Sequence, residues 1–526
     1  GRGRGSRARS GGVAVRRVLG FGPVFAPGGR WLAIACAVAL AAGLARLGHP
    51  GLWIEEIYTA RWAALPWPAL VTTLRGQLHP PLYFVLERLL APTLGGSEAG
   101  LRLLALLSGV AAVAAAFWAV RPILNDRVSA AAAWFLALSP QFFLYARMAQ
   151  YFALAALAAM VAHGLFVRLA MERGRPRSWA LYALAAALML YTSYLSLCLV
   201  LAHGVWAAVS RRRRELLPGW IAATAASLLL LSPWLVALSR AAAPRPVLVP
   251  PLVAKPAQAV LLLGLDLHAL TATELLFPWE PLGAVGVVCG AWLLGTGALA
   301  AVRRGLGRSV LLPAAAALAL SWAVVSSIAT TTPFVGIPAR TLFLWPFGAT
   351  LMALGALDSA QRRPLRWAAT AGVVLAWLMG WVHLYRGEHY MNPIYLTPGR
   401  EVAADVARQA RAGDVVLSET DSGVNYYLER LHTPFPVLDP VSPDSVRVLL
   451  AAPSTRRAWW VRLSRDGSQR ARPAEATEGL LGAWGSLEST RGYLEIDPRY
   501  QAVKRAALGV VPYQYRIVLQ RWSRKD

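Results

Sequence analysis

Two adjacent carboxylates, Glu55 and Glu56, follow an apolar stretch of the chain and lie among aromatic residues, Tyr58 included, in GLWIEEIYTARWA. Acidic side chains at the end of a long apolar segment are unfavourable unless they are hydrated, paired or used. Aromatic cover raises the proton affinity of a carboxylate, which can then act as a general base, and a carboxylate can also hold a metal ion. A helix cap or an ion pair with Arg61 would explain the same residues without chemistry. Both interpretations stay open.

A histidine is held in a fixed direction by the sequence His79-Pro80-Pro81-Leu82-Tyr83. Proline fixes its own backbone angle and suits the first turn of a helix, so the two prolines aim the side chains of His79 and Tyr83. We expect these side chains to line the same pocket as the carboxylates. The alternative is a histidine that only stabilises the helix start through a hydrogen bond.

Two single arginines stand apart from the basic clusters of the chain. Arg147 lies in YARMAQY, which ends at Tyr151, and Arg340 lies in PARTL. A guanidinium group matches the geometry of a phosphate and binds it through two hydrogen bonds. Lys255 is a further candidate for the same anion. The alternative is an arginine that reaches the membrane surface or pairs with an acid.

The elements that must position these residues are helices long enough to cross a membrane. The chain of 526 residues is 56% hydrophobic and 15% charged, and its 21 Trp and 35 Pro suit membrane interfaces and membrane helices. The sequence predicts an all-α polytopic membrane bundle of about eleven transmembrane helices. The spans are expected near residues 31–47, 101–120, 128–145, 151–169, 178–193, 194–210, 218–238, 281–301, 309–329, 339–357 and 367–385.

The distribution of arginine predicts the orientation of the bundle. If residues 1–30, a basic N-terminal segment, are cytoplasmic, alternation places five later connections on the same side, and all five are Arg-rich, as in Arg211 to Arg214. Anionic lipid explains these clusters and the net charge of +26 better than nucleic acid does, since no aromatic platform accompanies the charge. We therefore predict a multi-pass protein of the cell inner membrane with an extracytoplasmic C-terminal domain.

Two of the loops expected outside the cytoplasm carry polar residues. Loop 48–100 contains the stretch 79–95, which we expect to lie in the outer membrane interface or to dip into it; the span count becomes twelve if it crosses. Loop 239–280 is expected to place its polar side chains on a solvated surface rather than over a site. These side chains are Asp266, His268, Glu274 and Glu280.

After the transmembrane domain, residues 31–385, the sequence pattern over 386–526 is typical of a soluble α/β domain. Its expected elements are an amphipathic helix over 398–411 and strands over 414–417, 457–463 and 513–522. The three cysteines all fall inside expected spans and imply no disulfide framework.

The motifs LWIEEIYTARW, HPPLY, SPQFFLYARMAQYFALAALAAM, YTSY and PARTLFLWP, in this order, resemble the membrane glycosyltransferases of the GT-C class. The chain looks most like bacterial relatives of the dolichyl-phosphate-mannose protein mannosyltransferases and the aminoarabinose transferases. The likeness covers roughly residues 31–385. The family usually has Asp-Glu where this chain has Glu55-Glu56, so the resemblance maps the presumed catalytic base to Glu55. Ser193 stands where the family often shows His, and no role is carried to it.

The resemblance implies a sugar donor linked to undecaprenyl phosphate or a similar polyprenyl phosphate, and a lipid, protein or glycan acceptor on the outer face of the membrane. Glu55 would deprotonate or orient the acceptor hydroxyl, with Glu56 and His79 positioning it, while Arg147 and Arg340 hold the donor phosphate. A divalent metal ion stays open as a cofactor. The expected catalytic residues are Glu55 and Glu56, and the expected substrate-binding residues are Tyr58, His79, Tyr83, Arg147, Tyr151, Lys255 and Arg340.

A polytopic transporter or flippase is the main alternative function. Transporters tend to place ionisable residues near the membrane midplane and to be built from two related halves. The ionisable residues of this chain gather at one face and no internal repeat is visible, which favours the enzyme. A catalytically inactive GT-C-like scaffold is a third alternative, suggested by Glu in place of the usual Asp.

Overall fold

The computed structural model describes residues 27–77, 79–172, 175–241, 256–329, 338–418, 423–438, 441–463, 472–494, 497–500, 502 and 517–525. The chain divides into two compact units. The helical unit comprises Gly1–Leu47, Trp62–Gly96 and Gly100–Tyr385, and the sheet unit comprises Gly48–Arg61, Ser97–Ala99 and Arg386–Asp526. Helix α3, Ile54–Ala64, therefore begins in the sheet unit and ends in the helical one.

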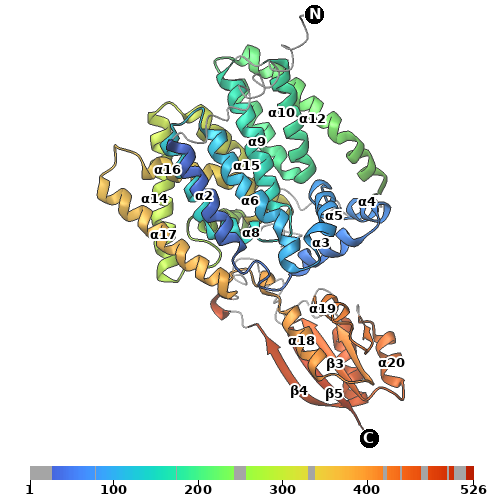
Figure 1. Ribbon diagram of the computed structural model, residues 1–526. Coiled ribbons are helices and arrows are strands. Elements are labelled where there is room, and N and C mark those ends of the chain that lie inside the picture. The colour runs from blue at the N-terminus through green and yellow to red at the C-terminus, as the bar shows by residue number, and fades with distance from the viewer. Residues whose placement is uncertain are drawn as a thin grey trace, which may run out of the picture. The chain divides into compact units, whose positions relative to one another are not determined.

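The helical unit is a bundle in which long apolar helices pack side by side (Figure 1). Short helices α4, α5 and α8 and the turns η1, η2 and η4 connect or extend the long ones. The elements are α2 (Pro27–Leu44), α4 (Trp67–Gly76), α5 (Leu82–Leu94), α6 (Glu98–Val120), α7 (Asp126–Leu138), α8 (Pro140–Ala146), α9 (Phe152–Met171), α10 (Pro176–Thr192), η1 (Tyr194–Ser196), α11 (Leu197–Val209), α12 (Arg213–Ala241), α13 (Pro256–Thr271), α14 (Pro281–Arg303), η2 (Gly307–Leu311), α15 (Leu312–Ala329), η4 (Pro338–Leu344), α16 (Trp345–Ala356) and α17 (Arg363–Arg386).

Each stretch expected to span the membrane is helical over most of its length. Within the described residues, five helices are long and apolar enough to cross a bilayer, and the count is six if α7 and α8 form one span. Three shorter apolar helices cover Gly28–Leu44, Tyr194–Val209 and Ser309–Val324. A polytopic membrane bundle is thereby confirmed, while the number of eleven spans stays a prediction.

The stretch expected as one span over 128–145 is broken in the structure. Helices α7 and α8 meet at an angle of 63°. The side chain of Ser139 accepts a hydrogen bond from the backbone N–H of Phe142, 3.2 Å away, and Pro140 occupies the first turn of α8. A serine cap followed by proline is a strong signal for a new helix start, so the local sequence accounts for the break.

Glycine allows helices α14 and α16 to approach until their backbones touch. A Cβ atom added to Gly297 of α14 would lie 1.9 Å from the carbonyl oxygen of Leu351 in α16. A Cβ added to Gly355 of α16 would lie 2.2 Å from the carbonyl oxygen of Leu293. Small residues at such contacts are typical of helix pairs in membranes, where close van der Waals packing drives association.

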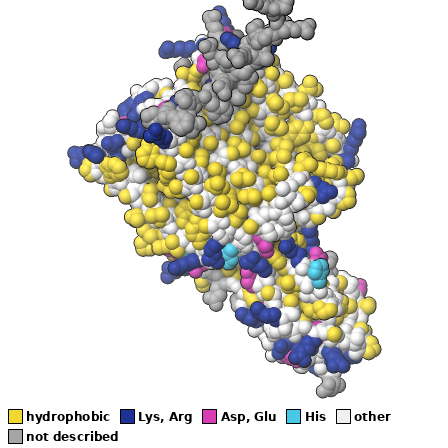
Figure 2. Space-filling view, in the orientation of Figure 1, with side chains coloured by type: hydrophobic (Ala, Val, Ile, Leu, Met, Phe, Trp, Pro, Cys, Tyr) yellow, Lys and Arg dark blue, Asp and Glu magenta, His cyan; other side chains and the backbone are white. Residues whose placement is uncertain are grey.

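The surface of the helical unit matches its expected surroundings. Figure 2 shows a broad cover of hydrophobic side chains over the bundle, with Lys and Arg mostly at its margins. Large apolar side chains such as Leu229, Val288 and Trp367 are 73%, 69% and 64% exposed. A surface of this kind suits contact with lipid rather than water.

The sheet unit carries a five-stranded mixed sheet in the order β2-β1-β3-β5-β4. Strand β1 runs parallel to β2 and β3, and β5 runs antiparallel to β3 and β4. In the register of the central strands, Leu417 pairs with Trp460 and Trp460 pairs with Gln520. The elements are η5 (Pro393–Leu396), α18 (Gly399–Gln409), β1 (Asp414–Ser418), α19 (Val424–Arg430), β2 (Val437–Leu438), α20 (Pro443–Ala451), β3 (Arg457–Leu463), α21 (Arg472–Trp484), β4 (Gly485–Tyr493) and β5 (Ile517–Arg524).

The core of the sheet unit is formed by apolar side chains on one face of β1 and β3 and on helices α20 and α21. Val415, Leu417, Trp460 and Leu481 are buried there, with Trp522 of β5 beside them. The expected helix and the first two expected strands match α18, β1 and β3. The last strand begins at Ile517, and residues 513–516 of its expected range lie outside the described residues. The predicted C-terminal α/β domain is confirmed.

Candidate active site

Arg340 and Tyr151 form one polar pair in the helical unit. Arg340 lies in the turn η4, directly before α16, and Tyr151 directly precedes α9. Nη1 of Arg340 donates a hydrogen bond to the hydroxyl oxygen of Tyr151 over 2.5 Å. The guanidinium group also lies 5.9 Å from the centre of the tyrosine ring. The pair places a fixed positive charge at the start of α9, where it can bind an anion.

The positive charge of Arg340 acts on His79 and disfavours protonation of its ring. Its ring packs against Trp62 and Phe84, with ring centres 5.4 Å apart in both pairs. Burial, and then the positive charge of Arg340, lower the pKa of His79 to about 4. The imidazole is therefore neutral near pH 7 and can accept or donate a hydrogen bond without adding charge. A hydrogen bond thus joins two of the predicted residues, Tyr151 and Arg340, and the charge of Arg340 acts on a third, His79.

Tyr83 is the second residue of α5 and follows His79 by four positions. Its side chain is fully buried. Its exposed fraction is 0%, and its ring meets Phe84 edge-on at 5.7 Å between centres. The expected effect of the prolines is borne out locally, since α5 begins at Leu82, immediately after Pro81. The role of Tyr83 in binding a substrate stays a prediction.

Arg147, the second predicted phosphate ligand, binds the end of helix α2. Its Nη2 donates hydrogen bonds to the carbonyl oxygens of Ala45 and Arg46, at 2.9 and 2.8 Å. Its guanidinium lies over the ring of Tyr385, whose hydroxyl donates to the carbonyl of Ala42. A guanidinium at the C-terminal end of a helix satisfies carbonyl groups that have no partner within the helix. These contacts hold α2 in the bundle, and binding of a phosphate by Arg147 stays a prediction.

Asp266, which was expected on a solvated surface, is half-buried and lies against the turn that carries Arg340. Oγ1 of Thr341, the residue after Arg340, lies 3.2 Å from Oδ1 of Asp266 in helix α13. Burial and the nearby charge of Glu274 raise the pKa of the Asp266 carboxyl to about 7, although the hydrogen bond from Thr341 opposes them. The signal in the sequence was an aspartate inside the apolar stretch LLLGLDLHAL.

Glu274 contradicts the expectation of a solvated loop. Its side chain is 3% exposed, and one carboxylate oxygen accepts hydrogen bonds from Gln141, at 2.5 Å, and from the hydroxyl of Tyr145. The amide oxygen of Gln141 accepts in turn from the backbone N–H of Glu274 and the hydroxyl of Thr273. Thr273 has a φ of 107°, which a β-branched residue rarely adopts, so this network holds a strained turn.

His268 also departs from the expectation, because it is 6% exposed and its Nε2 donates to the carbonyl of Leu276 over 2.8 Å. The physical reason is that the loop folds back on the bundle: every residue from Thr271 to Phe277 is buried. Buried polar groups must find partners, and the loop finds them on α8 and α17 as well as within itself. Glu280 is half-buried.

The two predicted catalytic acids lie in the sheet unit, at the start of α3, and their environments differ. Glu56 is fully buried, and its carboxylate accepts a hydrogen bond from the backbone N–H of Trp53 over 3.3 Å. This is the contact of a glutamate at the third helical position, which closes the helix start. Glu55 is half-buried in the first turn of the helix. Arg61 pairs with Glu429 at 3.5 Å, rather than with the acids of its own helix.

The contacts described above do not bear on substrate binding by two further predicted residues, Tyr58 and Lys255. Tyr58 is half-buried on α3. Lys255 lies outside the described residues. Substrate binding by either residue stays a prediction.

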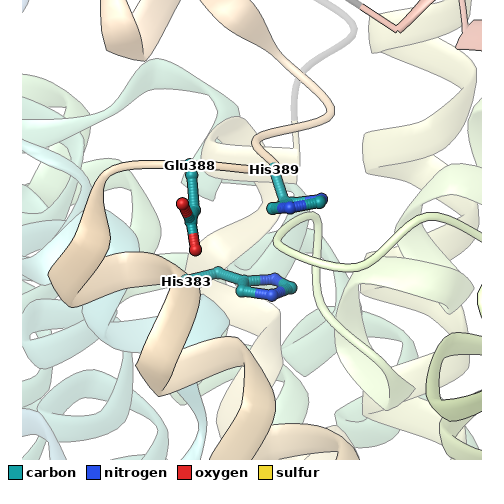
Figure 3. A group of neighbouring side chains, drawn as sticks. All are labelled: His383, Glu388 and His389. Atoms are coloured by element: carbon teal, nitrogen blue, oxygen red, sulfur yellow. The ribbon is translucent and has the colours of Figure 1, made fainter.

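Figure 3 shows His383, Glu388 and His389, residue types that commonly bind metal ions. His383 comes from α17 in the helical unit, where its Nδ1 donates to the carbonyl oxygen of Leu275 over 2.7 Å. Glu388 and His389 follow α17 and belong to the sheet unit, where the carboxylate of Glu388 pairs with Arg386 at 3.3 Å. Dependence on a divalent metal ion stays a prediction.

Comparisons with known proteins support the resemblance carried by the motifs. Residues 78–237 match the family model described as dolichyl-phosphate-mannose-protein mannosyltransferase. This segment contains four of the predicted residues, namely His79, Tyr83, Arg147 and Tyr151. A search of curated protein sequences finds no match.

Among solved structures, the chain is similar to ArnT from Cupriavidus metallidurans over almost the whole length of both proteins. The crystal structure bound to undecaprenyl phosphate gives a TM-score of 0.54 at 14% identity, over 94% of this chain and 98% of that one. The apo structure gives a TM-score of 0.54 at 11% identity, over 98% of both chains. The GT-C-like fold, and with it the resemblance to this class of membrane glycosyltransferases, is confirmed.

Proposed function

We propose that this membrane protein is a glycosyltransferase that moves a sugar from a polyprenyl-phosphate-linked donor to an acceptor. The observation that carries the proposal is the polar group of His79, Tyr151 and Arg340, two of whose members lie in the segment that matches the mannosyltransferase model. The likeness of fold to a protein that was crystallised with undecaprenyl phosphate supports the class of donor.

Arg340 is proposed to bind the phosphate of the donor. As the bond between the anomeric carbon of the sugar and the phosphate oxygen breaks, negative charge grows on the departing phosphate. A guanidinium already fixed in place stabilises that charge without reorganisation, and the hydrogen bond to Tyr151 provides the fixing. Since His79 is neutral near pH 7, it can donate a hydrogen bond to the same anion or to a sugar hydroxyl.

Glu55 is proposed to act as the general base that takes the proton of the acceptor hydroxyl. Its half-buried carboxylate, in the first turn of α3, combines access with partial removal from water. Glu56 then has a positioning role, because its bond to the N–H of Trp53 fixes the turn that carries Glu55. The acceptor is a lipid, a protein or a glycan.

The reaction is proposed to take place on the outer face of the cell inner membrane, with the sheet unit outside the cytoplasm. The Arg-rich connections support this orientation. Arg121 pairs with Asp126 at 2.8 Å between α6 and α7, and Arg303 pairs with Asp358 between the ends of α14 and α16. Both arginines lie in connections that the positive-inside rule places in the cytoplasm.

The test is transfer from a labelled polyprenyl-phosphate sugar by membranes that contain the protein. Glu55→Gln keeps the shape of the side chain but removes the base, so it should abolish transfer while the protein is still made at the wild-type level. Full activity of this variant would remove Glu55 from the mechanism. A transporter would leave the donor chemically intact in membranes with the wild-type protein and in membranes with Glu55→Gln.

A further inference from the structure

The segment that leads into helix α3, and so to Glu55, is buried within the sheet unit. Its last three residues, Gly51, Leu52 and Trp53, are all buried, and Leu52 is 1% exposed. The backbone N–H groups at the start of a helix have no partner within the helix, and a buried N–H without a partner is costly. The groups that bind the N–H of Leu52 and of Trp53 therefore fix the turn that carries Glu55.

Each of these two N–H groups donates to a side chain. The N–H of Trp53 donates to the carboxylate of Glu56, within the same helix start. The N–H of Leu52 donates to the hydroxyl oxygen of Tyr427 over 2.6 Å, although the two residues are 375 positions apart in the chain. Tyr427 lies in α19 and is 5% exposed. Glu56 thus closes the turn from within α3, whereas Tyr427 ties it to the C-terminal part of the sheet unit.

Close packing holds the segment before α3 against Tyr427. A Cβ atom added to Gly51 would lie 3.1 Å from the hydroxyl oxygen of Tyr427 and 3.2 Å from Cβ of Arg400 in α18. The guanidinium group of Arg400 also donates to the carbonyl oxygen of Gly48 over 3.1 Å. The backbone of the segment is therefore bound by side chains of two helices, α18 and α19.

Helix α3 itself packs against the same part of the sheet unit. The ring of Trp53 meets that of Tyr395 in η5 edge-on, with ring centres 5.1 Å apart. A Cβ atom added to Gly423, the residue before α19, would lie 2.8 Å from Cδ1 of Ile57. The helix that carries Glu55 is thus in contact with both η5 and the start of α19.

The hydroxyl group of Tyr427 keeps its proton over the whole physiological range. Burial raises the pKa of this hydroxyl above its ordinary value, and the negative charges of Glu98 and Glu56 act in the same direction. The hydrogen bond from Leu52 and the charge of Arg400 oppose this shift without reversing it. The phenol is therefore a neutral acceptor for the N–H of Leu52 at every pH at which transfer would be measured.

We propose that Tyr427 is a positioning residue for the sugar transfer, because its hydroxyl fixes the backbone at Leu52 and thereby the first turn of α3, which carries Glu55. This inference rests on the proposed function and gives the C-terminal part of the sheet unit a role in it. A general base must lie within hydrogen-bond reach of the hydroxyl whose proton it takes. A displacement of about 1 Å is enough to slow a reaction by about 100-fold.

The first test compares Tyr427→Phe, which removes the hydroxyl and keeps the ring, with Tyr426→Phe. The hydroxyl of Tyr426 accepts a hydrogen bond from Arg430 within α19, so this neighbour is the matched control. Transfer is measured in membranes with equal amounts of protein and a labelled polyprenyl-phosphate sugar. Tyr427→Phe should lower the maximal rate by about 10- to 100-fold and leave the KM for the donor unchanged, since Arg340 is intact. Tyr426→Phe should keep both values.

The second test is hydrogen exchange of the purified full-length protein in detergent, which separates a local effect from a loss of the fold. In Tyr427→Phe the N–H of Leu52 loses its acceptor and should exchange about fivefold faster. Strand β3 of the same unit should exchange as in wild type. Gly51→Ala is a second variant in case Tyr427→Phe does not fold. Its methyl group moves the segment away from Tyr427, so it should also slow transfer and speed exchange at Leu52.

The inference is overturned if Tyr427→Phe transfers sugar at the wild-type rate, if Tyr426→Phe loses as much activity, or if exchange at Leu52 does not change. Faster exchange throughout the sheet unit would also overturn it, because the hydroxyl would then serve the fold alone. Failure of the proposed function gives a different result, namely no transfer by the wild-type protein. The positioning role falls with it, whatever the exchange at Leu52.

Discussion

Tyr151 accepts a hydrogen bond from Nη1 of Arg340, although the two residues are 189 positions apart in the chain. The contact joins the start of α9 to the turn before α16, and His79 at the start of α5 lies within the influence of the same guanidinium. The hydrogen bond thus joins two segments that are distant in the sequence, and the same positive charge acts on a third segment.

Replacement of Arg340 by Ala should weaken use of the donor. Loss of a charge-assisted hydrogen bond to phosphate costs about 1.5–3 kcal/mol, which corresponds to a rise of about 10- to 150-fold in KM for the lipid-linked sugar. Tyr151→Phe removes the hydrogen bond that Arg340 donates to the tyrosine hydroxyl but keeps the guanidinium, so a smaller loss of about 1 kcal/mol should raise KM by about fivefold. Arg304→Ala, at the exposed C-terminal end of α14, is the matched control and should leave KM unchanged. Equal effects of Arg304→Ala and Arg340→Ala would argue against a phosphate site at Arg340.

Glu56→Ala should lower stability and Glu55→Gln should not. The buried carboxylate of Glu56 closes the start of α3, and loss of such a cap costs about 0.5–2 kcal/mol. The melting temperature of the purified protein, followed by tryptophan fluorescence, should therefore fall by a few degrees in Glu56→Ala alone. A melting temperature equal to that of wild type would show that the cap contributes little.

The histidine at position 79 should make the protein less stable in acid. The pKa of His79 is about 4 in the folded protein and about 6.5 in an unfolded chain, so the unfolded state binds more protons between these values. The stability contributed by the neutral imidazole is complete above about pH 6.5 and is lost as the pH falls toward 4.

His79→Asn should therefore show a smaller drop in melting temperature between pH 7 and pH 4.5 than wild type does. His432→Asn is a suitable control, because His432 is exposed and its φ of 49° is one that asparagine tolerates. The idea fails if both variants lose stability in acid by the same amount as wild type.

Gly297→Ala should destabilise the helical unit, whereas Gly295→Ala on the same helix should not. The new methyl group at position 297 would meet the backbone carbonyl of Leu351 at 1.9 Å, and a backbone atom cannot move aside cheaply. A Cβ at Gly295 meets nothing within 4 Å. Overpacking of this kind costs about 1–3 kcal/mol, visible as a lower melting temperature. Matching melting curves for the two variants would mean that α14 and α16 are not in backbone contact.

Much of the helical unit was predictable because apolar length is a local property of the sequence. Helix α9 covers Phe152–Met171 where 151–169 was expected, and α14 covers Pro281–Arg303 where 281–301 was expected. The break between α7 and α8 was also predictable from the local sequence, because Ser139 caps a helix and a proline follows it. A long apolar run outweighed that signal in the prediction of a single span.

The partners of the polar residues were less accessible to sequence reasoning, because they depend on contacts between distant segments. The buried carboxylate of Glu274 accepts a hydrogen bond from Gln141, which lies 133 positions away in the chain. No local sequence pattern at either residue predicts this contact. Arg147 was chosen for its side chain chemistry, whereas the carbonyl oxygens at the end of α2 that it binds belong to the backbone. Backbone acceptors leave no mark in a sequence, so this role could not have been anticipated.

The most direct measurement of the central claim follows a polyprenyl-phosphate sugar, labelled in both the sugar and the lipid, in membranes with and without the protein. The account predicts that the protein releases the lipid as free polyprenyl phosphate while the sugar label moves to an acceptor, and that Arg340→Ala slows both events together. Donor that remains intact in the presence of the wild-type protein and its native membrane acceptors would contradict it.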